Sequence, residues 1–198
     1  VDQIAAIGQE LREAAASGSW RASWCAGSGF VGAGSDQVQG ETNLLSTFLD
    51  QVRPIAERGV IFLASSADGS KVYVNSDQTG NFQVIDVRTG KITGQVNIGN
   101  DPNQMTLTKD GRFAYVPIRG DHTIAIVQLD PLKLIKHLPS APGPHDAYTS
   151  ADGKRIYVGA QFGNGIVVID PGTQSVLHTI PTEAGVRPLE PTADGKTI

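Results

Sequence analysis

From about residue 60 onward, the chain alternates short apolar runs with polar turns. Each cycle begins with an apolar run such as Val72-Tyr73-Val74, followed by a polar loop and a second apolar run such as Val84-Ile85-Asp86. The cycle closes with a run that alternates polar and apolar residues, as in 91–96. Runs of this length, bounded by Gly, Asn, Asp and Thr, predict β-strands rather than helices.

An Asp-Gly pair separates the strands of each cycle and returns every 42 residues. Glycine adopts the positive φ that a tight turn between right-twisted strands needs, and aspartate tolerates it, so the repetition is best explained as scaffold. A period of this size, with a few short strands per unit, is typical of a β-propeller blade or a related stacked β-unit. The four pairs are Asp68-Gly69, Asp110-Gly111, Asp152-Gly153 and Asp194-Gly195.

Each unit is expected to contain four antiparallel strands: one before the Asp-Gly turn, one after it, an apolar third strand and an alternating fourth. The middle two are apolar on both faces, as strands are when neighbouring sheets cover each side. The fourth alternates, so one of its faces is wet and it lies outermost. The sequence therefore predicts an all-β fold built from four-stranded propeller blades.

The residues of the units also resemble a known family. Tyr73-Val74, Tyr115-Val116 and Tyr157-Val158 follow the Asp-Gly turns, and Val-Ile-Asp with a Thr-Gly or Pro-Gly turn follows later, so residues 60–198 resemble YVTN β-propeller repeats. The Asn of that signature is present as Asn75, whereas Pro117 and Gly159 replace it in the other units. The resemblance implies a periplasmic or extracellular protein. Similar proteins include surface-layer components and lactonase-like or quinoprotein-like enzymes.

The repeat count sets a limit on ring closure. Residues 59–198 accommodate about 3.3 blades of 42 residues, whereas closed propellers have about four to eight. The sequence is therefore expected to be a fragment of a longer propeller, with ring completion by oligomerisation as the alternative. An isolated fragment of this kind should expose a blade face and an unpaired strand edge, which favours self-association.

Residues 1–58 have a different composition. Apolar spacing predicts amphipathic helices over 2–16 and 42–58, joined by a Gly, Ser and Ala-rich linker at 17–40, and neither helix is long or apolar enough to span a membrane. Gly27, Gly29 and Gly32 have the spacing of a dinucleotide-binding motif. They lack the preceding strand and following helix that the motif requires, so a nucleotide site is not expected.

Charge and cysteine content limit the classes of partner and cofactor that are expected. The formal net charge is −4 and no Lys/Arg cluster occurs, which argues against a nucleic-acid partner. The single cysteine, Cys25, has neither the second Cys nor the adjacent His of a covalent haem site. No cofactor is therefore identified from the sequence. The expected partner is a protein or a small-molecule ligand.

Candidate site residues are expected on one face of the blades. The loop between the second and third strands and the loop leading into the next blade share that face, and the innermost strands line the channel. Pro102, Pro144 and Pro188 set a common register at the start of the innermost strands. The candidate ligand-binding residues are Asn103, Gln104, Arg119, His145, Asp146, Gln161, Arg187 and Glu190.

His145 beside Asp146 is the most chemically suggestive pair. A neutral imidazole can bind a metal or act as a base, with Asp146 or Glu190 orienting it, and Arg119 with Arg187 could hold an anion. The alternative is that His145 only makes a structural hydrogen bond, because one histidine is not a catalytic constellation. His137 and His178 are interpreted as solvent-facing residues of outer strands, and His122 as a turn residue.

Two functional classes follow from these patterns. The first is a non-enzymatic propeller scaffold that binds a ligand or protein on its loop face, and it is favoured because the units contain no complete catalytic or metal set. The second is a lactonase-like, quinoprotein-like or metal-dependent enzyme with its site at the central channel. The fold alone does not decide between them, because propellers support many unrelated functions.

Overall fold

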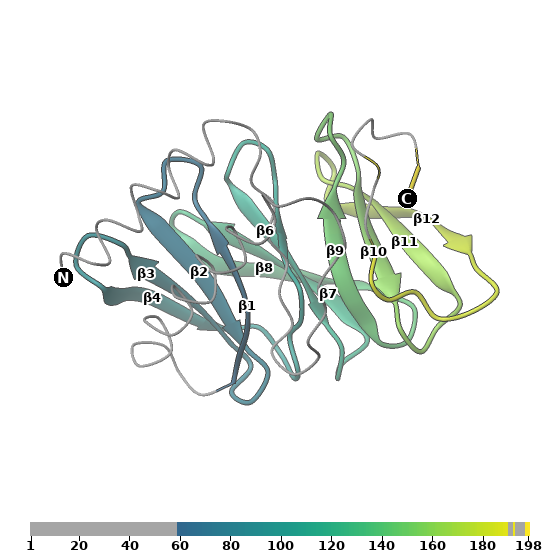
Figure 1. Ribbon diagram of the computed structural model, residues 1–198, viewed down its shortest axis with the longest axis horizontal. Coiled ribbons are helices and arrows are strands. Elements are labelled where there is room, and N and C mark those ends of the chain that lie inside the picture. The colour runs from purple at the N-terminus through teal and green to yellow at the C-terminus, as the bar shows by residue number, and fades with distance from the viewer. Residues whose placement is uncertain (1–58, 190–191, 193–196) are drawn as a thin grey trace, which may run out of the picture.

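The computed structural model describes residues 59–189, 192, 197 and 198, so the predicted helices over 2–16 and 42–58 lie outside the described residues. The described part contains strands and no helix, in three four-stranded antiparallel sheets (Figure 1). This confirms the all-β fold class and the plan of four strands per unit. The sheets are blade 1, β1 (Val60–Ser65), β2 (Lys71–Ser76), β3 (Asn81–Asp86) and β4 (Lys91–Asn97); blade 2, β5 (Thr106–Leu107), β6 (Phe113–Ile118), β7 (Thr123–Leu129) and β8 (Leu132–Pro139); and blade 3, β9 (Pro144–Thr149), β10 (Ile156–Ala160), β11 (Gly165–Asp170) and β12 (Ser175–Pro181).

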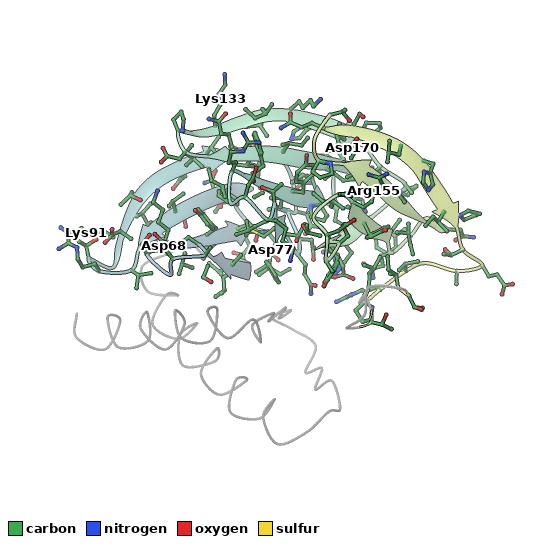
Figure 2. All side chains as sticks on the ribbon, turned by 90° about the horizontal axis from the view of Figure 1, so that it is seen from above. Asp68, Asp77, Lys91, Lys133, Arg155 and Asp170 are labelled. Carbon is green, nitrogen blue, oxygen red and sulfur yellow. The ribbon has the colours of Figure 1, made fainter. Side chains whose placement is uncertain are left out.

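The three blades stand side by side and form an arc (Figures 1 and 2). The strand order within each sheet follows the sequence, from β1, β5 and β9 on one edge to β4, β8 and β12 on the other. Lys91 and Lys133, which belong to the outer strands β4 and β8, lie on the outer rim of this arc in Figure 2. The innermost strands are therefore the ones that would border a channel.

A hydrogen-bonded turn joins the first two strands of every blade. In blade 1, the Ser66 hydroxyl donates to Asp68 Oδ1 (2.6 Å), and the Ser70 amide donates to the same oxygen (3.1 Å). The Ser66 hydroxyl also accepts the Lys71 amide at 3.0 Å, which closes the loop. The same contacts recur in blade 2 from Thr108, Asp110, Arg112 and Phe113, and in blade 3 from Ser150, Asp152, Lys154 and Arg155.

These contacts change the explanation of the repeated aspartate. Only the glycines of the turns have positive φ, with values of 66° at Gly69, 67° at Gly111 and 72° at Gly153. The aspartates before them are not among the residues with positive φ, so the expectation that Asp is present because it tolerates this conformation was wrong. Aspartate is present because its carboxylate accepts the hydroxyl and amide donors of the turn.

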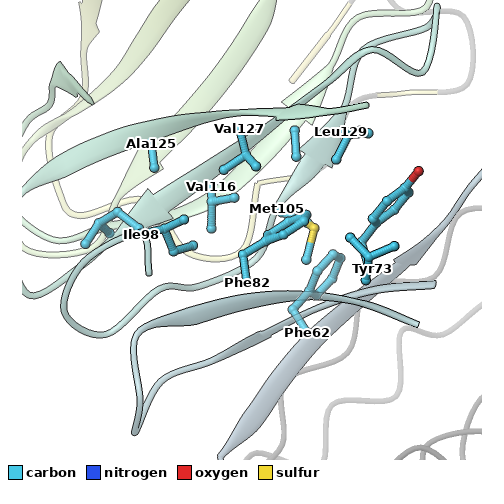
Figure 3. Packing of buried hydrophobic residues seen from close by; sticks show 12 residues of the cluster. Phe62, Tyr73, Phe82, Ile98, Met105, Val116, Ala125, Val127 and Leu129 are labelled. Atoms are coloured by element: carbon cyan, nitrogen blue, oxygen red, sulfur yellow. The ribbon is translucent and has the colours of Figure 1, made fainter. Parts of the chain in front are cut away.

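Apolar side chains fill the spaces between blades. Between blades 1 and 2, Met105 packs among Phe62, Phe82 and Val116, and the Tyr73 and Phe82 rings stack with centroids 5.9 Å apart (Figure 3). A second cluster, which includes Tyr115, Ile126, Ile156 and Val158, joins blades 2 and 3. Each large apolar side chain buried in this way contributes roughly 1.5–3 kcal/mol, so the interfaces between blades hold the arc together.

The outer strands face solvent, but the expected alternation is only partial. Exposed and partly buried residues alternate over 93–97 of β4 and 132–135 of β8, whereas β12 is exposed throughout 177–181. Both His137 and His178 are exposed, which confirms their assignment to the solvent side. His137 Nε2 nevertheless lies 3.0 Å from the carbonyl oxygen of Ile98 in the preceding blade connection. Within the described residues, no helix is long and apolar enough to cross a membrane.

The turn carboxylates should make stability depend on pH. The Thr108 hydroxyl is the main cause that holds the pKa of Asp110 at about 2, below its ordinary value of 3.8. A folded-state pKa below the unfolded value stabilises the fold above pH 3.8, and this contribution is lost as the pH falls toward 2. Asp110→Asn should therefore destabilise the protein by about 1 kcal/mol at pH 7, a value reduced for solvent exposure.

Urea unfolding at pH 7 and near pH 2 measures this effect. The difference between Asp110→Asn and the parent should shrink at the lower pH, because the Asp110 carboxyl is then about half protonated in the folded parent and almost fully protonated in the unfolded chain. Glu183→Gln, an exposed acidic position outside the turns, is the matched control and should change little at either pH. An Asp110→Asn effect of equal size at both pH values would contradict this account of the turn.

Candidate functional site

The segment that leads into β5 of blade 2 is hydrogen-bonded to the start of β9 of blade 3. The Gln104 amide donates to the His145 carbonyl oxygen (3.1 Å), and the Ala147 amide donates to the Gln104 carbonyl oxygen (3.0 Å). These two bonds form a parallel bridge between Gln104 and Asp146. The structure thus brings together two of the predicted site pairs, one from each blade.

A β-bulge occurs at the same place in every innermost strand. In blade 3, Gly159 pairs with Asp146 and Ala160 with Pro144, which leaves His145 as the extra residue. In blade 1, the register shifts between Val60 and Phe62, so Ile61 is the extra residue. In blade 2, Pro102 pairs with Ile118 and Thr106 pairs with Tyr115. Four residues on one side thus face three on the other, so the segment that contains Asn103 also has one extra residue. Bulges re-aim side chains, and they are common beside functional sites.

The bulge explains how His145 and Asp146 interact. Neighbouring residues of a regular strand point to opposite faces, yet His145 Nδ1 lies 2.8 Å from Asp146 Oδ1. The two residues are buried, with 1% and 3% exposure, and Asp146 Oδ2 has no hydrogen-bond partner. A neutral His145 that donates its Nδ1 proton to Asp146 keeps a lone pair on Nε2, the atom that could accept a proton or bind a metal.

Asn103, at the equivalent bulge of blade 2, is held only through its backbone. Its amide donates to the Pro117 carbonyl oxygen (2.8 Å), and its carbonyl oxygen accepts Asn75 Nδ2 (2.8 Å). The Asn103 side chain is 0% exposed, and neither its Oδ1 nor its Nδ2 has a partner. Leaving buried polar atoms unpaired costs roughly 1–3 kcal/mol each, so this side chain has unused hydrogen-bonding capacity.

Asn75 is a site residue that the sequence did not single out. It was noted only as the Asn of the repeat signature, but it is fully buried and links blade 1 to the segment that leads into β5 of blade 2. Its Oδ1 has no partner. A polar residue at the end of the apolar run Val72–Val74 was the available signal, because a buried amide needs a specific partner.

Arg119 is paired within its own blade. Its Nε and Nη2 donate to Asp101 Oδ2 (2.6 Å) and Oδ1 (3.1 Å), in a two-point contact. The side chains of Arg119 and Asp101 are 28% and 24% exposed. Asp101 has a φ of 59°, where the other two blades have Gly59 and Gly143 at the equivalent positions. The sequence suggested that Arg119 could hold an anion. In this arrangement Arg119 is not free to do so, because Asp101 already occupies it.

Asp77, Arg119 and Gln161 occupy one repeated position. Their amides donate to the carbonyl oxygens of Gly59, Asp101 and Gly143 at 2.9, 2.9 and 2.7 Å. Burial is the main cause that raises the pKa of Asp77; the charge of Asp101 adds to the rise and that of Arg119 opposes it. Asp77 Oδ1 and Gln161 Oε1 are buried and have no partner.

The remaining candidates lie at the loop ends. Arg187 is exposed, and Glu190 lies outside the described residues. Phe162, beside Gln161, is 65% exposed and was not predicted. His122 has a φ of 56° and its Nδ1 accepts the Gly143 amide (3.1 Å), which confirms it as a turn residue. No group of three or more His, Cys, Asp or Glu residues in the described part of the chain is placed to hold a metal ion.

Comparison with known proteins supports the propeller architecture. No family model and no curated protein sequence matches the chain. Among solved structures, hydrazine synthase from Kuenenia stuttgartiensis matches 68% of this chain with 31% identity and a TM-score of 0.64. Periplasmic gluconolactonase from Pseudomonas aeruginosa matches 64% of it with 23% identity and a TM-score of 0.57. The β-propeller domain of Cps50 (Swd1) from Myceliophteria thermophila matches 62% with 19% identity and a TM-score of 0.53.

The latter two matches show the fold alone, because their sequence identities are low. The chain spans 39%, 40% and 43% of the lengths of these three proteins, in the same order. The described residues are therefore blades of a β-propeller, and the matches extend over well under half of each of these propeller-containing chains.

The His145–Asp146 contact can be measured as a coupling energy. Removing one partner leaves the other buried without its hydrogen bond, so Asp146→Ala and His145→Ala should each destabilise the protein by roughly 1–3 kcal/mol. The double variant should be less destabilised than the sum of the two, by about 1 kcal/mol or more, because the residues interact directly. Urea unfolding of the four proteins gives this value, and strict additivity would mean that the contact is not formed in solution.

Proposed function

We propose that these blades form part of a ligand-binding propeller, and that the ligand contacts the bulged ends of the innermost strands. One observation carries this proposal: Asn103 and Asp146 present fully buried side-chain atoms that have no hydrogen-bond partner. Asn103 lies in the segment before β5 and Asp146 in β9, and the Gln104–His145 backbone bond joins these two segments. A polar ligand, or a polar group of a protein partner, would supply the missing bonds.

Comparison among the blades supports this reading. Blade 1 has Ile61 at the bulge position, and Ile61 packs against the apolar cluster between blades 1 and 2. An apolar residue is thus compatible with the fold at this position. Burying an unpaired amide or carboxylate is unfavourable. We therefore attribute Asn103 of blade 2 and Asp146 of blade 3 to ligand binding and not to folding.

The proposal also includes the family and the location of the protein, which the sequence and the similar structures support. The repeat signature supports membership of the YVTN repeat family, and the resemblance supports a periplasmic or extracellular location. The name of the Pseudomonas aeruginosa gluconolactonase, which calls it periplasmic, agrees with that location. The remaining blades, the identity of the ligand and the contribution of Arg119, Gln161, Arg187 and Glu190 are part of the same proposal.

An enzymatic propeller is the second candidate, and the His145–Asp146 pair favours it. A carboxylate that orients the Nδ1 proton of a buried imidazole is the arrangement of a general base. A hydrazine synthase and a gluconolactonase, both named as enzymes, are among the similar structures. Binding remains the first candidate because the described residues supply one imidazole and one carboxylate at this position without a further reacting group.

A thermal-shift screen with turnover measurements separates the two candidates. The chain is screened against gluconate, glucono-δ-lactone, neutral sugars and amino acids, and hits are repeated with Asn103→Ala and His145→Ala. A binding propeller should give a shift of the melting temperature that is reduced in both variants, without catalysed lactone hydrolysis in a pH-stat. Lactone hydrolysis that is lost in His145→Ala would establish the enzymatic candidate instead. Ligands whose binding is unchanged in both variants would show that the site lies elsewhere on the protein.

A further inference from the structure

Blade 1 has one face that no described blade covers. The blade lies at one end of the arc, so only its other face packs against blade 2 (Figure 1). Side chains alternate across a strand, so Tyr73 faces blade 2 whereas Val72 and Val74 point the opposite way. The clusters between the described blades contain neither valine. We call this opposite side the free face of blade 1; its buried side chains are Leu63, Val72, Val74, Gln83 and Ile85.

The free face is as well buried as the faces that meet a neighbouring blade. Val72 and Val74 are each 1% exposed, and Ile85 is 2% exposed. Val74 occupies the same position of the repeat as Val116 and Val158, which are buried because the preceding blade packs on them. A sheet face with nothing packed on it leaves its side chains open to water. Burial of the free face therefore requires a covering layer, and the described strands do not supply it.

The other end of the arc provides an internal comparison. Tyr157 and Ile166 of blade 3 occupy the repeat positions of Tyr73 and Phe82, but no described blade follows blade 3. Tyr73 and Phe82 are buried against blade 2, whereas Tyr157 and Ile166 are partly exposed. A face without a neighbouring blade is thus recognisable by the exposure of these side chains. The free face of blade 1 lacks that exposure, although no described blade covers it.

The sequence that precedes β1 offers an apolar surface of suitable size. The amphipathic helix predicted over 42–58 leads directly into Gly59 and β1. In a helix the stretch 44–52 would extend about 13 Å, which is close to the width of three strands spaced about 4.8 Å apart. The buried side chains of the free face lie on three strands, β1, β2 and β3. The apolar side of the predicted helix consists of Leu44, Leu45, Phe48, Leu49 and Val52.

We propose that residues 42–58 dock on the free face of blade 1 through this apolar side and cap that end of the arc. Repeat arrays need a terminal layer that is polar outside, because the last repeat otherwise exposes its apolar face. Asn43 and Asp50, on the opposite side of the predicted helix, would provide that polar surface. A further propeller blade would pack on the same face, so in a longer propeller the segment and a closing blade would compete for it. This inference does not depend on the proposed ligand site.

A charge placed in the apolar side should release the segment. Phe48→Asp should lower the melting temperature of the full chain by about 5 °C or more, because a carboxylate is unfavourable against an apolar face. Asn43→Asp adds the same charge on the polar side of the predicted helix and should change the melting temperature by less than about 2 °C. Phe48→Asp should also form larger assemblies in light scattering, because an uncovered blade 1 fits the open face of blade 3 in a second copy. Equal behaviour of the two variants would contradict the proposal.

Photo-crosslinking of the full chain identifies the segment on the free face, and it decides the question even if Phe48→Asp does not fold. The photoreactive amino acid p-benzoyl-phenylalanine replaces Phe48, which exchanges one aromatic ring for a larger one, and cross-links in the monomeric fraction are mapped by mass spectrometry. We expect links to β2 and β3 peptides that contain Val72, Val74 or Ile85. The same photoreactive group at position 43 is the control and should not link to these peptides. Links from position 48 that join two copies, that reach only blade 3, or that miss blade 1 altogether would overturn the proposal.

Discussion

The hydrogen-bonded turn between the first two strands of each blade is the constraint on which the rest of the structure depends. A side-chain hydroxyl, an Asp carboxylate and a left-handed Gly close the same loop in all three blades, as at Ser66, Asp68 and Gly69. This closure fixes the register of the first strand pair, and a slip of one residue would reverse the face of every side chain. Positions separated by 42 residues consequently occupy equivalent places in successive blades.

Equivalence of position is what makes the differences between blades informative. At the bulge, blade 1 has Ile61, blade 2 has Asn103 and blade 3 has His145. At the end of the second strand, the same comparison gives Asp77, Arg119 and Gln161. The backbone bonds at these places are alike in all three blades, so the fold tolerates an apolar, a neutral polar or a charged side chain there. Chemistry can vary at these positions without a change in the scaffold.

Local patterns predicted the elements, whereas contacts between blades could not be predicted. The four strands per unit, the exposed outer strands and the innermost location of His145 and Asp146 all followed from spacing and alternation. The bond from Asn75 to the Asn103 carbonyl oxygen joins residues 28 apart, and no pattern within one unit reveals it. The pairing of Arg119 with Asp101 was also not predicted. Gly59 and Gly143 occupy the position of Asp101 in the other two blades, so the repeat gave no indication of a carboxylate there. The bulge itself leaves no mark in the alternation of so short a strand.

The Asp101–Arg119 pair shows how blade 2 departs from the repeat in a coordinated way. Replacing the repeated glycine by aspartate places a non-glycine residue at a φ of 59°, which is unfavourable but is tolerated best by Asn and Asp. The opposite strand then supplies Arg119, whose two-point contact with the Asp101 carboxylate offsets part of that cost. Blade 1 places a carboxylate, Asp77, at the position of Arg119 and keeps Gly59 opposite it, so that carboxylate has no such partner. The two-point contact is therefore a feature of blade 2 alone among the described blades, whereas burial raises the pKa of Asp77 in blade 1 and the charge of Arg119 opposes that rise.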